Sequence, residues 1–448
     1  MNYALRDKKY VWHPFTQMQD WLREENLVIQ RGQGVWLYDV DGNRYLDGVS
    51  SLWVTVHGHN HPVLNDALKK QLGTVAHSTF LGLSHTVGID LAQKLVEITP
   101  APLEKVFFSD NGSTAMEIAL KVAYQYWKQK ENGRFSRKTK FVTFSDGYHG
   151  DTVGAVSLGS IDLFHALYRP LLFDTIKAPY PYVYGFKGTA DDCCFSCLNA
   201  LEDILKERSD EIAAVVIEPE VQGASGMHMT PAGYMKGVEQ LVRDYNVLLI
   251  IDEVATGFGR TGEMFASEIE QIHPDIMAVA KSLTGGYLPL SATLTTCEVF
   301  EAFLGDYQEL KTFFHGHTYT ANPLGCAVSL ANLALYEQEN ILQNVAERAR
   351  RFHLFSKKLY ELPHVGDIRQ KGLMIGIELV KDRDTRQTYP WEQKIGIKVI
   401  QEARRHGIII RPLGNVIVLM PPLCITGKEF SFLLDGTYQS IKTITEKK

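Results

Sequence analysis

The 448-residue sequence lacks several features that mark other classes of protein. No apolar run approaches the roughly 20 residues that a membrane-spanning helix requires. The net charge of -6 leaves no basic excess of the kind that binds nucleic acid or an anionic membrane. The first 12 residues carry charges but no apolar segment of an export signal. We therefore expect a cytoplasmic protein that acts on small molecules, with no nucleic-acid or membrane partner.

Cysteine is also scarce, with six residues in the chain. Cys193, Cys194 and Cys197 form one short cluster that contains a C-x-x-C pair, a spacing found in zinc and redox sites. A structural zinc ion needs a second pair of ligands, and no matching pair follows in the sequence. We expect reduced thiols and no metal site, with zinc or redox chemistry as the alternative.

Two apolar runs each end abruptly in an ionisable residue. Residues 248–251 are Leu-Leu-Ile-Ile and stop at Asp252, and residues 276–280 stop at Lys281. Short β-branched runs of this kind are typical of buried strands in a parallel sheet. Ligands of open α/β sheets bind at the carboxyl ends of the strands, so Asp252 and Lys281 are candidate site residues. An exposed lysine in a strand-to-loop turn is the alternative for Lys281.

The spacing of the apolar runs predicts an α/β protein. Strands and helices alternate between about 66 and 320, which favours a mostly parallel sheet covered on both faces. We predict an N-terminal part of a small domain over 1–65, a large domain over 66–320 and a C-terminal small domain over 321–448. The predicted elements are strands at 105–109, 140–144, 213–218, 247–252, 276–280, 366–369, 373–379 and 416–420, a hairpin at 41–42, and helices at 62–73, 86–98, 113–127 and 324–362.

Residues 257–262 match the G-x-G-x-x-G pattern of dinucleotide-binding proteins. That pattern should follow a strand directly and open a helix. Here five residues separate it from the strand, and two of them are acidic where a pyrophosphate would lie. The sequence therefore disfavours a nicotinamide cofactor.

The stretch 252–262, together with Pro274, Asp275 and Lys281, resembles the signature of class III aminotransferases. The resemblance covers nearly the whole chain. It implies the type I fold of pyridoxal phosphate (PLP) enzymes, with a large domain and a smaller α+β domain built from both termini. It also implies that Lys281 is the Schiff-base lysine and that Asp252 faces the pyridinium nitrogen.

The resemblance assigns further cofactor roles. The turn at 109–117 lies between a strand and a helix, where amides bind anions, although an ordinary helix cap is the alternative. Family members place this turn on the PLP phosphate, which here implicates Gly112 and Ser113. Tyr148 matches an aromatic residue that stacks on the ring and takes part in catalysis. His317 and Thr318 match the segment that binds the cofactor of the neighbouring subunit, which implies a homodimer with shared sites.

The motifs at 12–16, 50–53, 148–152 and 411–415 resemble the branch of the family that aminates 8-amino-7-oxononanoate in biotin biosynthesis. In that branch Arg411 would bind the far carboxylate of the substrate, since a guanidinium fork suits a carboxylate. The other substrate-binding residues that the resemblance implies are Phe15, Leu52, Trp53, Tyr148, Lys281 and Gly316.

Phe15 and Leu52 depart from the pattern of members that use S-adenosylmethionine as amino donor, which have Tyr and Trp at these positions. We expect S-adenosylmethionine as donor, with lysine as a close second. An aminotransferase of the ornithine or 4-aminobutyrate type and a non-enzymatic binding protein with the same fold are the alternatives.

Overall fold

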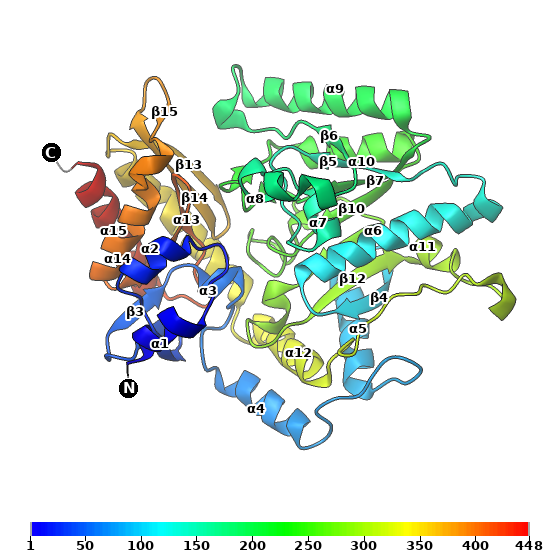
Figure 1. Ribbon diagram of the computed structural model, residues 1–448, viewed down its shortest axis with the longest axis horizontal. Helices are drawn as coiled ribbons and strands as arrows, with labels where there is room; N and C mark the ends of the chain where they lie inside the picture. Colours follow the sequence, from blue (N-terminus) through cyan, green and yellow to red (C-terminus); the bar gives the residue numbers. More distant parts are fainter. Residues whose placement is uncertain (1, 447–448) are drawn as a thin grey trace.

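The computed structural model describes residues 2–446 and has a seven-stranded sheet at its centre (Figure 1). β12 is antiparallel to both of its neighbours, and the remaining pairs are parallel. The five strands predicted between 105 and 280 are present, with ends within two residues of the prediction. The strand order is β4 (Leu103–Ser109), β12 (Ser291–Thr296), β11 (Ile276–Val279), β10 (Leu248–Asp252), β7 (Ile212–Ile217), β5 (Lys140–Phe144) and β6 (Ile176–Ala178).

Both faces of this sheet are buried. Side chains alternate between the two faces along each strand. Val216 and Ile250 pack in one apolar cluster with α6, whereas Val215 and Ile251 pack in another with α5, α9, α10 and α12. Burial on both faces explains why these strands read as unbroken apolar runs. The helices are α4 (Pro62–Leu72), α5 (Thr86–Ile98), α6 (Gly112–Gln129), α7 (Val153–Leu158), α8 (Asp162–His165), α9 (Ala190–Arg208), α10 (Tyr234–Asp244), α11 (Cys297–Glu301) and α12 (Pro323–Gln338).

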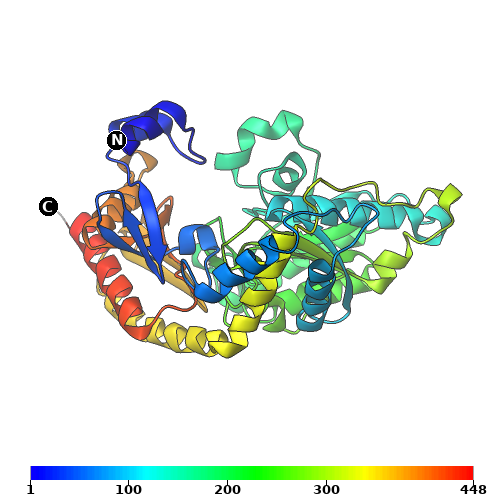
Figure 2. The ribbon, with the colours of Figure 1, turned by 90° about the horizontal axis from the view of Figure 1, so that it is seen from below.

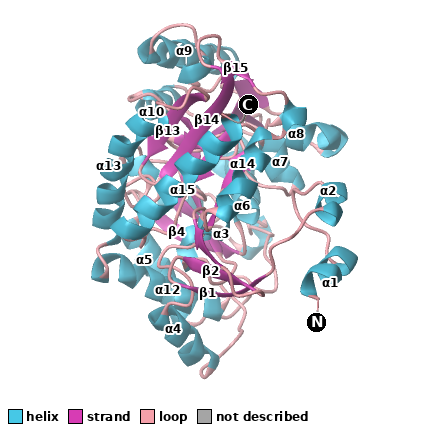
Figure 3. Ribbon diagram, turned by 90° about the vertical axis from the view of Figure 1, so that its left-hand side faces the viewer, coloured by secondary structure: helices cyan, strands magenta, loops and turns pink. Residues whose placement is uncertain are grey.

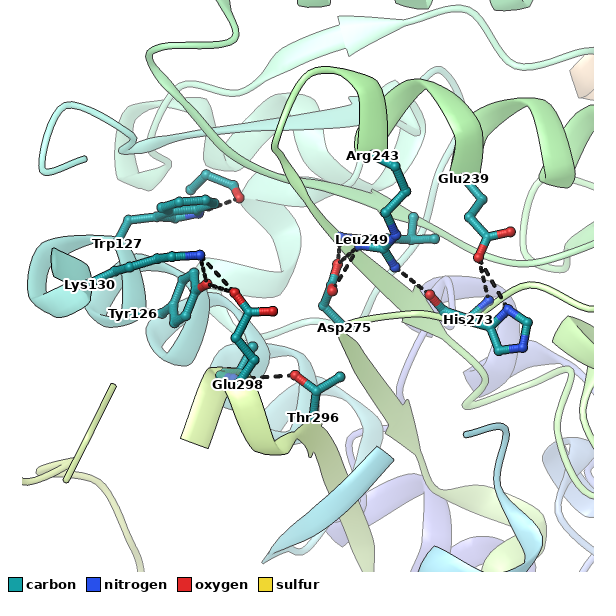
Figure 4. Close-up of polar contacts among 12 residues, drawn as sticks. Tyr126, Trp127, Lys130, Glu239, Arg243, Leu249, His273, Asp275, Thr296 and Glu298 are labelled. Carbon is teal, nitrogen blue, oxygen red and sulfur yellow. Dashed lines mark hydrogen bonds and ion pairs between the residues drawn. The ribbon is translucent and has the colours of Figure 1, made fainter. Parts of the chain in front are cut away.

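The amino ends of two central strands are joined by polar contacts with the end of α10 (Figure 4). Asp275 precedes β11, and its carboxylate accepts hydrogen bonds from the Arg243 guanidinium at 2.7 and 2.8 Å and from the Leu249 amide at 2.7 Å. These bonds join α10, β10 and β11 at the edge of the sheet opposite Lys281. Asp275 of the signature motif therefore supports the scaffold.

The smaller part of the molecule is built from both ends of the chain. β16 pairs in parallel with β3, which joins a C-terminal strand to the N-terminal hairpin of β2 and β3. α13, α14 and α15 cover these sheets (Figure 3). The elements are β1 (Ile29–Gln33), β2 (Trp36–Asp39), β3 (Arg44–Asp47), β13 (Val365–Lys371), β14 (Met374–Asp382), β15 (Gln387–Thr388), β16 (Ile408–Ile409), β17 (Arg411–Leu413), β18 (Val416–Leu419), α1 (Tyr3–Tyr10), α2 (Met18–Arg23), α3 (Ser50–Trp53), α13 (Ile341–Leu359), α14 (Ile395–Arg405) and α15 (Gly427–Thr445).

The predicted helix over 324–362 is in fact two helices. α12 ends at Gln338 and α13 begins at Ile341. Asn340 separates them with a φ of 50°, a left-handed conformation that asparagine adopts more readily than most residues. α12 packs on α4 and α5, and α13 packs on β13 and α15, so the pair links the two parts of the molecule (yellow in Figure 2). The domain boundaries at 65 and 320 stay a prediction.

The six cysteines are all free thiols in the structure. The C-x-x-C pair lies on α9, where Cys193 and Cys197 are buried and burial raises the pKa of both thiols. Within residues 2–446, no group of three or more His, Cys, Asp or Glu side chains is arranged to hold a metal ion. None of the described helices is long and apolar enough to cross a membrane.

Candidate active site

Three neighbouring strands bring three ionisable residues to one edge of the central sheet. Lys281 follows β11, Asp252 ends β10, and Glu218 follows β7, and these strands are adjacent and parallel. Both Asp252 and Glu218 are buried. The structure thus brings Asp252 and Lys281 to the same carboxyl edge, as the sequence predicted, and adds a carboxyl group that the prediction omitted.

Asp252 is held by two hydrogen bonds. Its Oδ2 lies 2.7 Å from Nδ1 of His149, which donates, and its Oδ1 accepts from the Val254 amide at 3.0 Å. His149 is buried as well. A buried carboxylate bonded in this way has a fixed orientation, which suits it to face a positively charged ring nitrogen.

The Lys281 side chain has no hydrogen-bond acceptor among the described residues. Its Nζ lies 5.5 Å from the ring centroid of Trp53. Burial lowers the pKa of Lys281, while the carboxylates of Asp252 and Glu218 act in the opposite direction. A lowered pKa increases the fraction of neutral amine, which is the nucleophilic and proton-accepting form. Lys281 also has a φ of 45°, a strained conformation of the kind found at functional sites.

The amino end of α6 forms a cradle for an anion. Asn111 caps the helix through the amide of Thr114, and in the described structure the amides of Gly112 and Ser113 have no acceptor. A Cβ on Gly112 would lie 2.6 Å from Cγ1 of Val254, so only glycine fits this close approach. Free amides and the helix dipole together favour a phosphate here.

Tyr148 is tied to this cradle through Asp151. The Tyr148 hydroxyl donates to Oδ2 of Asp151 at 2.9 Å, and the Asp151 amide donates to Oγ of Ser113 at 3.0 Å. Burial and the negative charge of Asp151 raise the pKa of Tyr148, so its phenol keeps its proton. Gly150, with a φ of 122°, lies so close to Ser113 that a Cβ there would be 1.9 Å from its Oγ.

Trp53 forms an apolar wall beside Lys281. It is buried, has a φ of 63°, and packs in one cluster with Met374, Val418 and Met420. Its indole Nε1 is buried without a partner among the described residues. Such a donor is available to a ligand.

Arg411 begins β17 and pairs in register with Val418, a member of the Trp53 cluster. The side chain is exposed, and within residues 2–446 no acceptor or carboxylate contacts its guanidinium. An arginine without an ion-pair partner in the described chain, on a strand paired with this apolar cluster, fits the predicted role of binding a carboxylate.

The remaining predicted residues lie on the surface of the single chain. Phe15 is 61% exposed and packs edge-on against Phe164 at 5.3 Å, and Leu52 is 50% exposed. Phe164 in turn contacts the Tyr148 ring at 6.4 Å, so Phe15 reaches the site through one intermediate ring. Leu52 has no aromatic ring and therefore makes no ring contact with Phe164 or Tyr148.

Gly316, His317 and Thr318 lie in the loop between α11 and α12. Nδ1 of His317 lies 3.5 Å from Oδ2 of Asp110, two residues before the α6 cradle. Thr318 is exposed, and its side chain forms no hydrogen bond within the described chain. The predicted substrate contact of Gly316 and the predicted roles of His317 and Thr318 at a neighbouring subunit remain predictions.

Sequence reasoning did not assign roles to three residues that the structure places in the site, namely His149, Asp151 and Glu218. The sequence does contain a sign of Glu218, because an apolar run stops at this residue as another stops at Asp252. His149 and Asp151 lie beside Tyr148 in the sequence, but only the fold shows which groups they contact.

Comparisons with known proteins identify the family of this chain. The family described as "Aminotransferase class-III" matches residues 18–441. The chain belongs to the class III aminotransferase family and is an aminotransferase. Enzymes of this family use PLP.

Among relatives, the chain is 51% identical over 442 residues to the adenosylmethionine-8-amino-7-oxononanoate aminotransferase of Geobacter sulfurreducens, covering 98% of this chain and 97% of that protein. The crystal structure of the enzyme of the same name from Methanocaldococcus jannaschii has a TM-score of 0.93 at 45% identity over 98% of both chains. An omega transaminase from Pseudomonas jessenii in complex with PMP has a TM-score of 0.95 at 31% identity, covering 100% of this chain and 99% of that one. The predicted type I fold is confirmed.

The residues present fit PLP. The amides of Gly112 and Ser113 suit its phosphate, and the Asp252 carboxylate is fixed by His149. The amine of Lys281 has no hydrogen-bond acceptor among the described residues.

Proposed function

We propose that this aminotransferase converts 8-amino-7-oxononanoate to 7,8-diaminononanoate in biotin biosynthesis. The observation that carries the proposal is Arg411, whose guanidinium has no ion-pair partner within residues 2–446 and whose backbone pairs with Val418 of the apolar Trp53 cluster. The acceptor has a long apolar chain between a reacting ketone and a carboxylate. A pocket with an apolar wall and a distant guanidinium matches these two features.

The roles of the site residues follow from their contacts. PLP supplies an electron sink for the carbon from which the amino group leaves. The amine of Lys281 accepts the proton from that carbon and returns it on the other side of the reaction, as a general base and acid. Asp252, oriented by His149, would hold a negative charge at the ring nitrogen. The Gly112 and Ser113 amides would bind the phosphate, and Tyr148 would cover the ring.

Replacing Arg411 by alanine should raise the KM for the keto-acid acceptor by roughly tenfold to a hundredfold, because a hydrogen bond to a charged group contributes about 1.5–3 kcal/mol. The first half-reaction with the amino donor should change less. Steady-state kinetics with the acceptor varied would measure the effect. Arg405→Ala, at an exposed arginine paired with Glu402, is the matched control. An unchanged acceptor KM in the Arg411 variant would remove the main support for this substrate.

We propose S-adenosylmethionine as the amino donor, with lysine ranked close behind. Relatives at about half identity carry the name of the adenosylmethionine-dependent enzyme. Phe15 and Leu52 replace the Tyr and Trp of members that use this donor, which removes a phenol and an indole. The sulfonium and adenine of the donor would favour contact with aromatic faces. Phe15 retains a stacking face, and Leu52 has none.

Restoring both aromatic groups with Phe15→Tyr and Leu52→Trp should increase the S-adenosylmethionine half-reaction relative to that with lysine. Each contact is worth about 1 kcal/mol, so the ratio should shift by roughly fivefold for each substitution. Conversion of the cofactor from its aldehyde to its amine form, followed by absorbance with each donor separately, gives the ratio. A ratio that stays constant would show that the donor is selected elsewhere in the pocket.

We also propose that the enzyme is a cytoplasmic homodimer with shared active sites. The support is the exposed Thr318, together with exposed apolar side chains in the same loop, Phe314 at 72% and Tyr319 at 55%. A second chain that packs on this loop would bury those side chains. Thr318 would then lie next to the phosphate of the cofactor in that second chain. The free thiols agree with a reducing compartment.

A further inference from the structure

Glu218 accepts hydrogen bonds from the backbone of two different segments of the chain. Its Oε1 accepts from the Tyr148 amide at 3.1 Å, and its Oε2 accepts from the Gly223 amide at 3.1 Å. The side chain is buried, with 6% of its surface exposed. No lysine, arginine or histidine of the described chain forms an ion pair with it, so the two amides are its direct partners.

Each of these amides lies next to an aromatic side chain of the site. Tyr148 carries the phenol that is bonded to Asp151, and its ring would cover the cofactor. Gly223 lies against Trp53, since a Cβ built on it would be 3.2 Å from Cζ3 of that ring. A single carboxylate thus bonds the backbone at both segments, which we call the Tyr148 and Gly223 walls.

This arrangement depends on the ionised form of the carboxyl group. A carboxylate accepts hydrogen bonds at both oxygens, whereas the protonated oxygen of a carboxylic acid donates and cannot accept well from an amide. Burial raises the pKa of Glu218 to about 7, with His149 lowering it and Asp252 raising it. The ionisable groups that act on Glu218 or respond to its charge are His149, Asp252, Lys281, Tyr148 and Tyr180.

We propose that Glu218 is a positioning residue whose ionised carboxylate holds the Tyr148 and Gly223 walls at the spacing that binds the keto-acid acceptor, and whose protonation releases one of them. It acts through those backbones and not on the substrate. The choice of acceptor rests on the proposed function, while the role of Glu218 in setting the walls does not.

The first test is the pH dependence of acceptor binding. In the wild-type holoenzyme the acceptor KM should be low at pH 8 and rise about tenfold as the pH falls through 7, because Glu218 takes up a proton over that range. Glu218→Gln places an NH2 group against one of the two amides, so its KM should be about tenfold higher already at pH 8 and change little with pH. The effect on kcat should be smaller in both cases. Glu218→Asp keeps an ionisable carboxylate and should restore the pH dependence.

Glu220→Gln is the matched control. Glu220 lies two residues away and is also buried, but its carboxylate pairs with Lys371 at 2.7 Å. Its replacement should leave the pH dependence of the acceptor KM unchanged. Circular dichroism and thermal melting of each variant would show that the fold is retained.

A second test does not use activity. Infrared difference spectra of the cofactor-free protein should show a buried protonated carboxyl group that disappears as the pH rises through 7. Glu253 also has a pKa raised by burial to about 7, so the Glu218 signal is the part lost in Glu218→Gln and kept in Glu220→Gln. Trp53 fluorescence should change over the same pH range, and Glu218→Gln should remove that change.

These readouts separate the two proposals. If the wild-type enzyme does not aminate the acceptor, the proposed function fails, and the infrared and fluorescence titrations still decide the role of Glu218. The Glu218 proposal is overturned if Glu218→Gln and wild type share one KM profile, or if Trp53 fluorescence titrates identically in both.

Discussion

Replacing Lys281 by alanine should lower turnover by about 10⁴-fold or more, the upper range for the loss of a general acid–base group. The structure places its amine beside Trp53, without a hydrogen-bond acceptor among the described residues, at the end of a buried strand next to Asp252. Within residues 2–446, Lys281 is the lysine that directly follows β11. The cofactor should still bind, because the Gly112 and Ser113 amides and Asp252 are unaffected.

Borohydride reduction followed by mass spectrometry would show whether the cofactor is attached covalently at residue 281. The cofactor should become attached to the wild-type chain at Lys281 and should not become attached to the variant. Single-turnover kinetics would measure the loss of rate. Lys381→Ala, at an exposed lysine at the end of β14, should behave as wild type. Turnover within tenfold of wild type in Lys281→Ala would refute the assignment.

The second large effect concerns the charge of Asp252. Asp252→Asn keeps the shape of the side chain and an oxygen that can accept from His149, but it removes the negative charge. The variant should retain PLP, and its half-reactions should slow by roughly 10²–10³-fold, the usual cost of losing an electrostatic group that stabilises a transition state. Stopped-flow absorbance of the cofactor would measure both half-reactions.

Asp275→Asn is the matched control for this change. Asp275 lies at the opposite end of the same strands, where it accepts from Arg243 and the Leu249 amide. Its replacement should lower thermal stability and leave the half-reaction rates of the folded enzyme close to wild type. Equal half-reaction rates in Asp252→Asn and wild type would show that Asp252 does not face the ring nitrogen.

The sequence predicted Asp252 and Lys281 as site residues because the pattern that marks them is local. Apolar strands that end in Asp252 and Lys281 must place these residues at one edge once the strands lie parallel, and the structure has them on adjacent strands. The same rule applies to Glu218, which sequence reasoning passed over. β12 was missed because Ser291–Thr296 is made largely of small residues and threonine and has no long apolar run.

Other parts of the site depend on contacts that spacing does not encode. The bond from His149 to Asp252 joins residues 103 positions apart, and the one from Glu218 to Tyr148 joins residues 70 apart. The break at Asn340 arises from one left-handed residue inside a helical pattern. The proposed contact of Thr318 with a phosphate involves a second chain, which the fold of one chain does not position.

The most direct test of the account is to incubate the purified holoenzyme with 8-amino-7-oxononanoate and either S-adenosylmethionine or lysine, and to quantify 7,8-diaminononanoate by mass spectrometry. The account predicts the diamine with at least one of these donors and its loss in Lys281→Ala. No diamine with either donor, together with turnover of ornithine or 4-aminobutyrate, would contradict it.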